Sequence, residues 1–103
     1  MKIKTSELTD HDLVWAVALC EGKPVESINW QVAGPIIERE GIRLYKGITG
    51  VWWACTTADP HHPYCANTPA MAAMLCYVCS VLGKEVDVPD DPQTRINNDL
   101  PTL

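Results

Sequence analysis

The residues best suited to metal binding gather between His61 and Cys79. Cys76 and Cys79 form a Cys-x-x-Cys pair that could bind zinc together with Cys65 and one of His61 or His62, because thiolate and imidazole are common zinc ligands. The pair falls in the third turn of an expected helix, whereas zinc pairs of this kind normally lie in a knuckle. Buried free thiols are therefore the favoured interpretation, and we predict no metal and no cofactor, with a zinc site as the alternative.

The same residues offer two kinds of catalysis. A redox Cys-x-x-Cys pair depends on a helix N-terminus to lower the pKa of its first thiol, and Cys76 lies far from that end of its helix. Cys65 beside His61 or His62 could act as nucleophile and base. The sequence supplies neither an orienting third residue nor an oxyanion hole, so we predict no catalytic residue.

Four tryptophans and no phenylalanine give the chain an unusual aromatic inventory. Trp52 and Trp53 are adjacent on an expected strand, so their rings point to opposite faces of a sheet. At least one of them leaves the core side unless both faces are covered, and Trp30 lies in an irregular segment. An exposed indole indicates a partner protein, a second subunit or a flat ligand. The alternative is that all four tryptophans fill the core.

Several donors could complete a site for an anion. Gly34-Pro35 and Thr68-Pro69 each favour a helix N-terminus, where free N–H groups suit a phosphate or carboxylate. Aromatic faces, helix ends and an arginine together predict a pocket for a nucleotide-like anion. The predicted ligand-binding residues are Trp30, Gly34, Arg39, Trp53, Thr56, Thr57 and Thr68.

The composition of the chain limits the classes of protein to which it can belong. With 103 residues the chain has room for one domain, and 47% hydrophobic residues are enough to fill its core. The net charge is −5, so the chain lacks the excess of positive charge that releases counterions from a phosphate backbone, and direct nucleic-acid binding is disfavoured. The start of the chain lacks a signal-peptide pattern and no stretch predicts a membrane span, so we expect a cytosolic protein. Five cysteines then indicate free thiols.

The helix expected after Thr68 determines the fold class. From Ala70 to Leu82 its only polar residue is Ser80, so the helix has almost no face for solvent. It is shorter than the roughly 20 residues that span a bilayer. Such a helix must be buried by a sheet and by other helices.

The other elements follow from local patterns. Thr9 caps an amphipathic helix that ends at Gly22, residues 23–32 are irregular, and Gly34-Pro35 opens a short helix ending at Gly41. Strands are expected over residues 1–5, 42–46, 51–57 and 85–88, with a four-residue hairpin loop over 47–50 and a long loop over 58–67. We predict an α+β domain over residues 1–89, in which a mostly antiparallel sheet packs on the buried C-terminal helix. Residues 90–103 are expected to be a flexible tail.

Four segments resemble the NinX-like proteins, small accessory proteins of tailed phages of enteric bacteria. They are MKIKTSELT at the start, WAVALCEG over residues 15–22, GPIIEREGI over 34–42 and TPAMAAMLCYVCSVLGKEVDVP over 68–89. The resemblance implies a phage protein made in the cytoplasm of its bacterial host. It implies no reaction.

These observations favour a non-enzymatic phage accessory protein that counters host defence by sequestering a small nucleotide-derived signal. One alternative is an inhibitor that binds a host protein through an exposed tryptophan surface. A small zinc protein or enzyme is a further alternative. We expect self-association, as a symmetric dimer.

Overall fold

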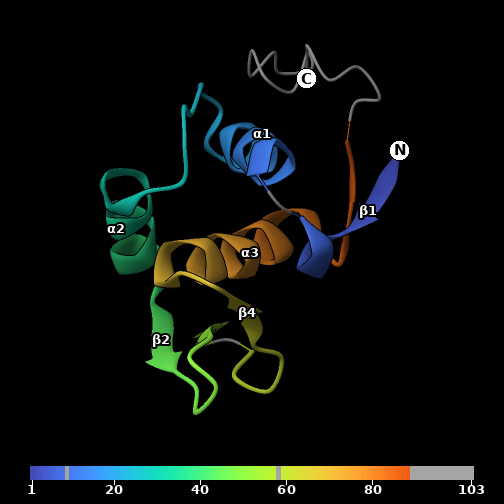
Figure 1. The fold of residues 1–103 in the computed structure, drawn as a ribbon. Helices are drawn as coiled ribbons and strands as arrows, with labels where there is room; N and C mark the ends of the chain where they lie inside the picture. Colours follow the sequence, from blue (N-terminus) through green and yellow to red (C-terminus); the bar gives the residue numbers. More distant parts are fainter. Residues whose placement is uncertain (9, 58, 89–103) are drawn as a thin grey trace.

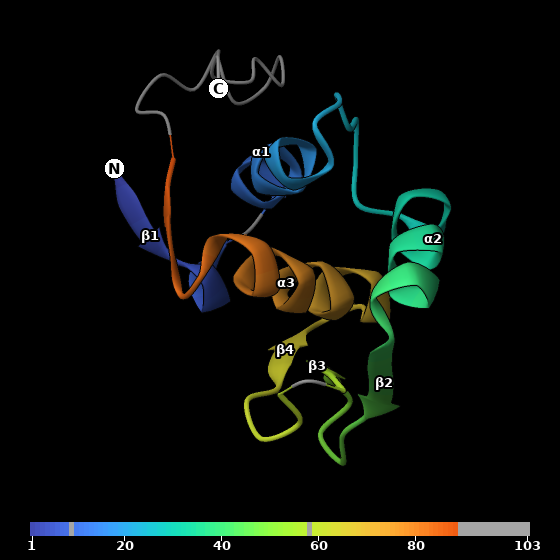
Figure 2. The same cartoon turned by 180° about the vertical axis from the view of Figure 1, so that it is seen from behind.

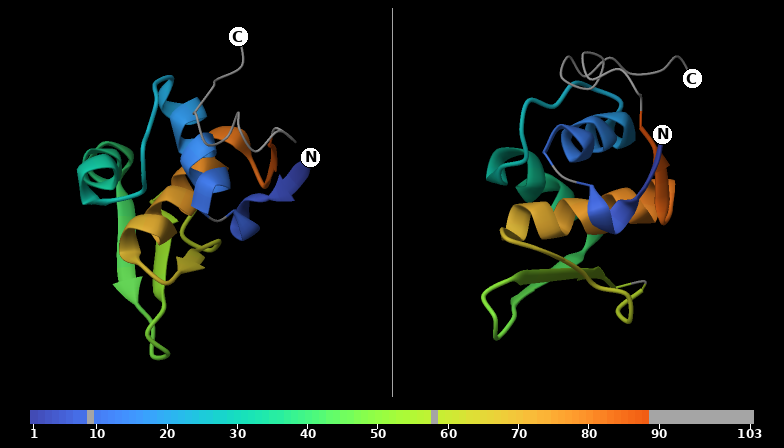
Figure 3. Two further views of the ribbon diagram at one scale, coloured as in Figure 1. Left: turned by 45° about the horizontal axis from the view of Figure 1, so that its top comes forward. Right: turned by 45° about the vertical axis from the view of Figure 1, so that its right-hand side comes forward.

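A single helix, α3 (Pro69–Leu82), runs through the middle of the molecule in the computed structural model, which describes residues 1–8, 10–57 and 59–88. Helices α1 (Asp10–Glu21) and α2 (Trp30–Glu40) lie on one side of it, and a small antiparallel sheet lies on the other (Figures 1 and 2). The right-hand view of Figure 3 shows α3 between α1 and the strands. The predicted α+β class is confirmed.

Helix α3 has the ends and the burial that its sequence predicts. The Thr68 hydroxyl accepts a hydrogen bond from the backbone N–H of Met71 at 3.2 Å, and Pro69 takes the first helical position. Gly83 follows the last turn with a positive φ of 90°. The helix is buried at Ala70 and at every residue over 72–78, so its apolar surface is covered all round.

The sheet that covers one side of α3 contains β2 (Ile42–Lys46), β3 (Trp52–Thr56) and β4 (Tyr64–Ala66), in that order. Leu44, Ala54 and Tyr64 are paired across it. Side chains alternate between faces along a strand, so this row and Trp52 share the face that packs on α3. Tyr45, Trp53 and Cys65 form the neighbouring row and share the opposite face.

The adjacent tryptophans therefore lie on opposite faces of the sheet, as predicted. Trp52 packs against the core, whereas the Trp53 indole lies over Gly47. A Cβ at Gly47 would come within 2.8 Å of the Trp53 Nε1 atom, so only glycine leaves room for this ring. The other two tryptophans differ sharply, since Trp15 is buried and Trp30 is 57% exposed.

Two details of the sheet differ from the prediction. Residues 64–66 form β4, although a loop was expected over 58–67, because three residues between Pro63 and Asn67 carry too short a pattern to indicate a strand. The β2–β3 loop is one residue longer than expected. Lys46 pairs with Trp52, and the Gly47 N–H donates to the Val51 carbonyl at 2.8 Å.

The middle helix starts earlier than predicted. Helix α2 begins at Trp30, and its N-cap is Asn29, whose side-chain oxygen accepts a hydrogen bond from the Val32 N–H at 3.0 Å. The prediction of a helix N-terminus at Gly34-Pro35 is wrong, because Pro35 lies inside the helix and removes only one backbone hydrogen bond there. The end at Gly41, which has a φ of 66°, is confirmed.

The two ends of the described chain form a second sheet, where one sheet was expected. Strands β1 (Lys2–Lys4) and β5 (Glu85–Asp87) pair antiparallel, with Ile3 opposite Val86. Between β1 and α1 lies a 3₁₀ turn, η1 (Thr5–Glu7). The predicted tail over residues 90–103 lies outside the described residues.

One hydrophobic core joins these elements and extends from Leu8 to Val88. In α1 the six consecutive residues 13–18 are buried, so the buried surface of this helix is wider than that of the predicted amphipathic helix. No helix of the described residues has both the length and the apolar character that crossing a membrane requires.

Thr5 ties the N-terminus to the end of α3. It is the buried polar residue of the described chain; its hydroxyl donates to the Gly83 carbonyl at 2.6 Å, and its N–H donates to the Lys84 carbonyl at 2.8 Å. The side-chain bond satisfies a carbonyl at the helix end that would otherwise lack a partner there.

We expect Thr5→Val to lower the free energy of unfolding by about 1–3 kcal/mol, because it keeps the shape of the side chain but removes the hydroxyl donor. Urea denaturation monitored by circular dichroism measures the change. Thr5→Ser retains the donor and serves as the control. Equal losses for both variants would contradict the role of the hydrogen bond.

Candidate functional site

The segment that joins α1 to α2, residues 22–29, forms a wall shared by two cavities. Glu26 and Ser27 line both of them, so the two cavities adjoin at these residues. We call them the apolar cavity and the polar cavity, and together the groove. Their volumes of about 350 and 360 Å³ lie at the lower end of the range of small-molecule sites.

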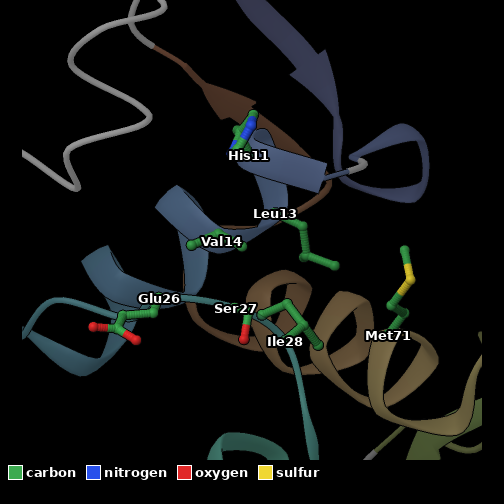
Figure 4. A pocket seen from close by; sticks show the side chains of 7 residues that line it. All are labelled: His11, Leu13, Val14, Glu26, Ser27, Ile28 and Met71. Atoms are coloured by element: carbon green, nitrogen blue, oxygen red, sulfur yellow. The ribbon is translucent and has the colours of Figure 1, made fainter.

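The apolar cavity lies where α1, the connecting segment and the start of α3 meet. The side chains of Leu13, Ile28 and Met71 turn toward one common space, with Glu26 at the far end from Met71 (Figure 4). The complete lining is His11, Leu13, Val14, Glu26, Ser27, Ile28 and Met71. Most of this surface is hydrocarbon, which suits a flat or apolar group.

The polar cavity lies between the connecting segment and the first turns of α2. Asn29 and Gln31 bring side-chain amides to it, and Lys23 brings a positive charge. Val32 and Ile36 provide apolar contacts. Its remaining lining residues are Glu21, Pro24, Val25, Glu26, Ser27 and Pro35.

Trp30 lies directly beside the polar cavity. It is the first residue of α2, and its neighbours Asn29 and Gln31 both line that cavity. More than half of its surface is exposed, at 57%. The apolar surface of a large exposed indole is unfavourable in free energy while it is in contact with water, unless a partner covers it.

A hydrogen-bonded network holds Glu21, which lines the polar cavity. The Arg39 guanidinium donates to both carboxylate oxygens of Glu21, at 2.8 and 3.4 Å, and to Glu40 at 2.8 Å. The Tyr77 hydroxyl donates to Glu21 at 2.5 Å, and Arg39 lies 5.5 Å from the centre of the Tyr77 ring. The network therefore joins the end of α1 to α2 and α3.

The network shifts the titration of its members. The hydrogen bond from Arg39 holds the pKa of Glu21 below its ordinary value, and the bond from Tyr77 acts in the same direction. Burial raises the pKa of Tyr77, and the Glu21 carboxylate raises it further. Beside the network, burial raises the pKa of the Cys20 thiol to about 12, which keeps it protonated.

A third, smaller cavity of about 130 Å³ holds the chemistry-bearing residues of the loop and of α3. In it His62 contacts Asp59 at 2.7 Å, and the Tyr64 hydroxyl donates to the Cys79 thiol at 2.8 Å. The hydrogen bond with His62 lowers the pKa of Asp59. Burial raises the pKa of the Cys76 thiol to about 11.

Of the residues of the zinc alternative, His62, Cys76 and Cys79 line the third cavity, whereas Cys65 and His61 are not among its lining residues. Cys65 is exposed on β4, Cys76 is buried, and the Cys79 thiol is engaged by Tyr64. Across residues 1–8, 10–57 and 59–88, no three or more His, Cys, Asp and Glu side chains form a group able to hold a metal ion. The zinc alternative gains no support from the described residues.

The predicted ligand-binding residues are distributed over the molecule. Trp30 and Gly34 lie in the first half of α2, and Arg39 lies near its end, where two carboxylates engage it. Thr56, whose hydroxyl accepts a hydrogen bond from the Asp59 N–H at 3.1 Å, lines the small third cavity.

The remaining three predicted residues lie away from the groove lining. Trp53 occupies the outer face of the sheet, Thr57 follows β3 and is exposed, and the Thr68 hydroxyl caps α3. Of the seven, Trp30 alone is next in sequence to groove-lining residues on both sides, and none lines the groove itself.

Sequence reasoning missed the residues that do line the groove. Lys23, Glu26 and Ile28 belong to a segment without periodicity, and Met71 resembles an ordinary core residue of α3. A usable signal was present at Asn29, which is a preferred N-cap residue and would have placed the start of α2 at Trp30.

Comparison with known proteins gives one finding. The model of a protein family described as Bacteriophage P22, NinX, matches residues 23–81, which is more than half of the chain. The matched region begins at Lys23 in the wall of the polar cavity and ends in the last turn of α3. No curated protein matches the chain.

The Glu21 network predicts a dependence of stability on pH. The pKa of Glu21 is lower in the folded chain than its ordinary value of 4.5, so its contribution is complete above that value and is lost as pH falls through the folded pKa. We expect Glu21→Gln to lower the free energy of unfolding at pH 7 by about 1–3 kcal/mol, and by less at pH 3, which lies below the ordinary pKa of the carboxyl.

Urea titrations of both proteins at the two pH values measure this difference. Glu38→Gln, an exposed carboxylate on α2, is the control and should show little effect at either pH. A loss for Glu21→Gln that is the same at pH 7 and pH 3 would contradict the assignment.

Proposed function

The chain belongs to the Bacteriophage P22 NinX family, and on that premise we propose that it is a phage accessory protein that acts by binding and not by catalysis. Its proposed role is to counter host defence in the host cytoplasm by sequestering a small nucleotide-derived signal. The groove is its proposed site. The observation that carries the proposal is a pair of adjoining cavities of ligand size, with the exposed Trp30 next in sequence to two residues that line the polar cavity.

Each part of the groove matches a part of such a ligand. We assign the base of the ligand to the apolar cavity, against Leu13, Ile28 and Met71. Trp30, whose neighbours Asn29 and Gln31 line the polar cavity, is assigned to stack on the second base of a larger ligand, because every nucleobase can stack on an aromatic face. Lys23 and the amides of Asn29 and Gln31 are donors for phosphate or sugar oxygens.

Enclosure and stacking must provide most of the affinity. The chain carries a net charge of −5, so its overall field does not attract anions. Arg39 is already engaged by Glu21 and Glu40, which leaves Lys23 as the cation that lines the groove among the described residues. A binding protein with this charge pattern selects its ligand by shape and by local contacts.

We expect Trp30→Ala to weaken the binding of nucleotides with two bases by roughly fivefold to a hundredfold, since stacking on one aromatic side chain is worth about 1–3 kcal/mol. Isothermal titration with mononucleotides, ADP-ribose and cyclic dinucleotides measures the affinity, and native mass spectrometry reports the ligand and the number of subunits. Tyr45→Ala is the matched control, because Tyr45 is an aromatic residue of similar exposure, 48%, on the opposite side of α3.

Absence of binding by the wild-type chain to every nucleotide in this panel would refute the signal-trap proposal. An equal loss of affinity for Trp30→Ala and Tyr45→Ala would be consistent with nucleotide binding but would contradict the groove as its site.

A second candidate function rests on the outer face of the sheet. Tyr45 and Trp53 lie side by side there, Cys65 continues the row, and Ile48 in the adjoining loop is fully exposed. Tyr45 is 48% exposed and Trp53 is half-buried, and aromatic side chains that are only partly covered are typical of protein interfaces. The second proposal is therefore an inhibitor that binds a host protein, or a second copy of itself, through this face.

For this candidate we expect Trp53→Ala to abolish recovery of a stoichiometric partner from host lysate, because aromatic anchors dominate the energy of interfaces. Affinity purification followed by mass spectrometry measures the recovery, and size-exclusion chromatography with light scattering measures self-association. Trp30→Ala, on the other side of α3, should leave both unchanged. If the partner protein is still recovered with Trp53→Ala, the sheet face is not the interface.

A further inference from the structure

Glu26 occupies a special place in the groove, because it lines both cavities where they adjoin. It is exposed, and no described residue forms an ion pair or a hydrogen bond with its side chain. Glu21, the other carboxylate of the groove, is instead paired with Arg39. Glu26 therefore brings an acceptor without a protein donor to the boundary of the two cavities.

A nucleotide that lies across both cavities must place a suitable group beside this carboxylate. A phosphate is excluded there by repulsion between like charges. A base edge, that of guanine above all, also offers donors, but the apolar cavity beyond Glu26 already provides an enclosure that suits a base, which leaves the sugar beside the carboxylate. The cis-diol of a ribose offers two neighbouring O–H donors, which match the two oxygens of one carboxylate.

We infer that the groove recognises nucleotides with a free ribose 2′,3′-diol, and that the Glu26 carboxylate accepts the hydrogen bonds of this diol. This inference rests on the proposed function and adds to it the orientation of the nucleotide in the groove. The base lies in the apolar cavity against Leu13, Ile28 and Met71, and the ribose lies at Glu26. The phosphate lies in the polar cavity, where Lys23 is the cation.

The same geometry separates classes of nucleotide. A mononucleotide or an ADP-ribose-like molecule with a free diol provides both donors to Glu26. A 3′,5′-linked cyclic nucleotide provides only the 2′ hydroxyl, and a dideoxynucleotide provides neither. Because hydrogen bonds to a charged acceptor are the stronger kind, loss of the diol should be the most costly change to the sugar.

The test compares AMP with 2′,3′-dideoxy-AMP by NMR titration of the full chain up to millimolar ligand. We expect AMP to bind the wild-type chain roughly tenfold or more tightly, and we expect the ratio to approach one in Glu26→Ala. Glu38→Ala, an exposed carboxylate on α2 outside the groove lining, is the control and should keep the wild-type ratio.

A second variant tests the orientation. Lys23→Gln should weaken AMP but leave adenosine, which has no phosphate, unchanged. Binding of AMP with equal affinity for the dideoxy analogue would overturn the inference about Glu26 while the signal-trap proposal stands. Absence of binding by any nucleotide, AMP included, would overturn both.

Discussion

The fold depends on the need to cover α3 on every side. Its residues over 72–78 are buried without interruption, and an exposed apolar helix of this length would cost about 25 cal/mol for each Å² left in water. In the described part of the chain, α1, α2 and two small sheets cover this helix, and neither sheet has more than three strands. Elements of this size depend on packing against α3 for their stability, so the helix organises the rest of the chain.

The groove is a consequence of the same constraint. The ordered helices α1 and α2 cover α3 with close-packed side chains, but the segment between them must turn and cannot pack as tightly. The adjoining cavities lie along this segment, and Met71 of α3 reaches the wall of one of them. The Glu21–Arg39–Tyr77 network ties both helices to α3, so the position of Glu21 in the lining of the polar cavity is held by hydrogen bonds.

Sequence reasoning predicts the parts of this protein that local chemistry decides. The burial of α3, its cap at Thr68 and the opposite faces of Trp52 and Trp53 follow from residue types and periodicity alone. Strands β1 and β5 were predicted, but their pairing into a separate sheet depends on residues far apart in the sequence, and β4 was missed because three residues carry too short a pattern. The groove was missed for a related reason, because its lining comes from an irregular segment and from residues such as Leu13 and Met71 that resemble core.

The placement of aromatic residues separates two binding modes that the sequence could not distinguish. Trp30 lies on the α2 side of α3, whereas Tyr45 and Trp53 lie on the outer face of the sheet, which covers the opposite side (Figure 1). The two surfaces share no residue. The proposed ligand site and the proposed protein interface therefore lie on opposite sides of α3, so a substitution in one surface should leave the other intact.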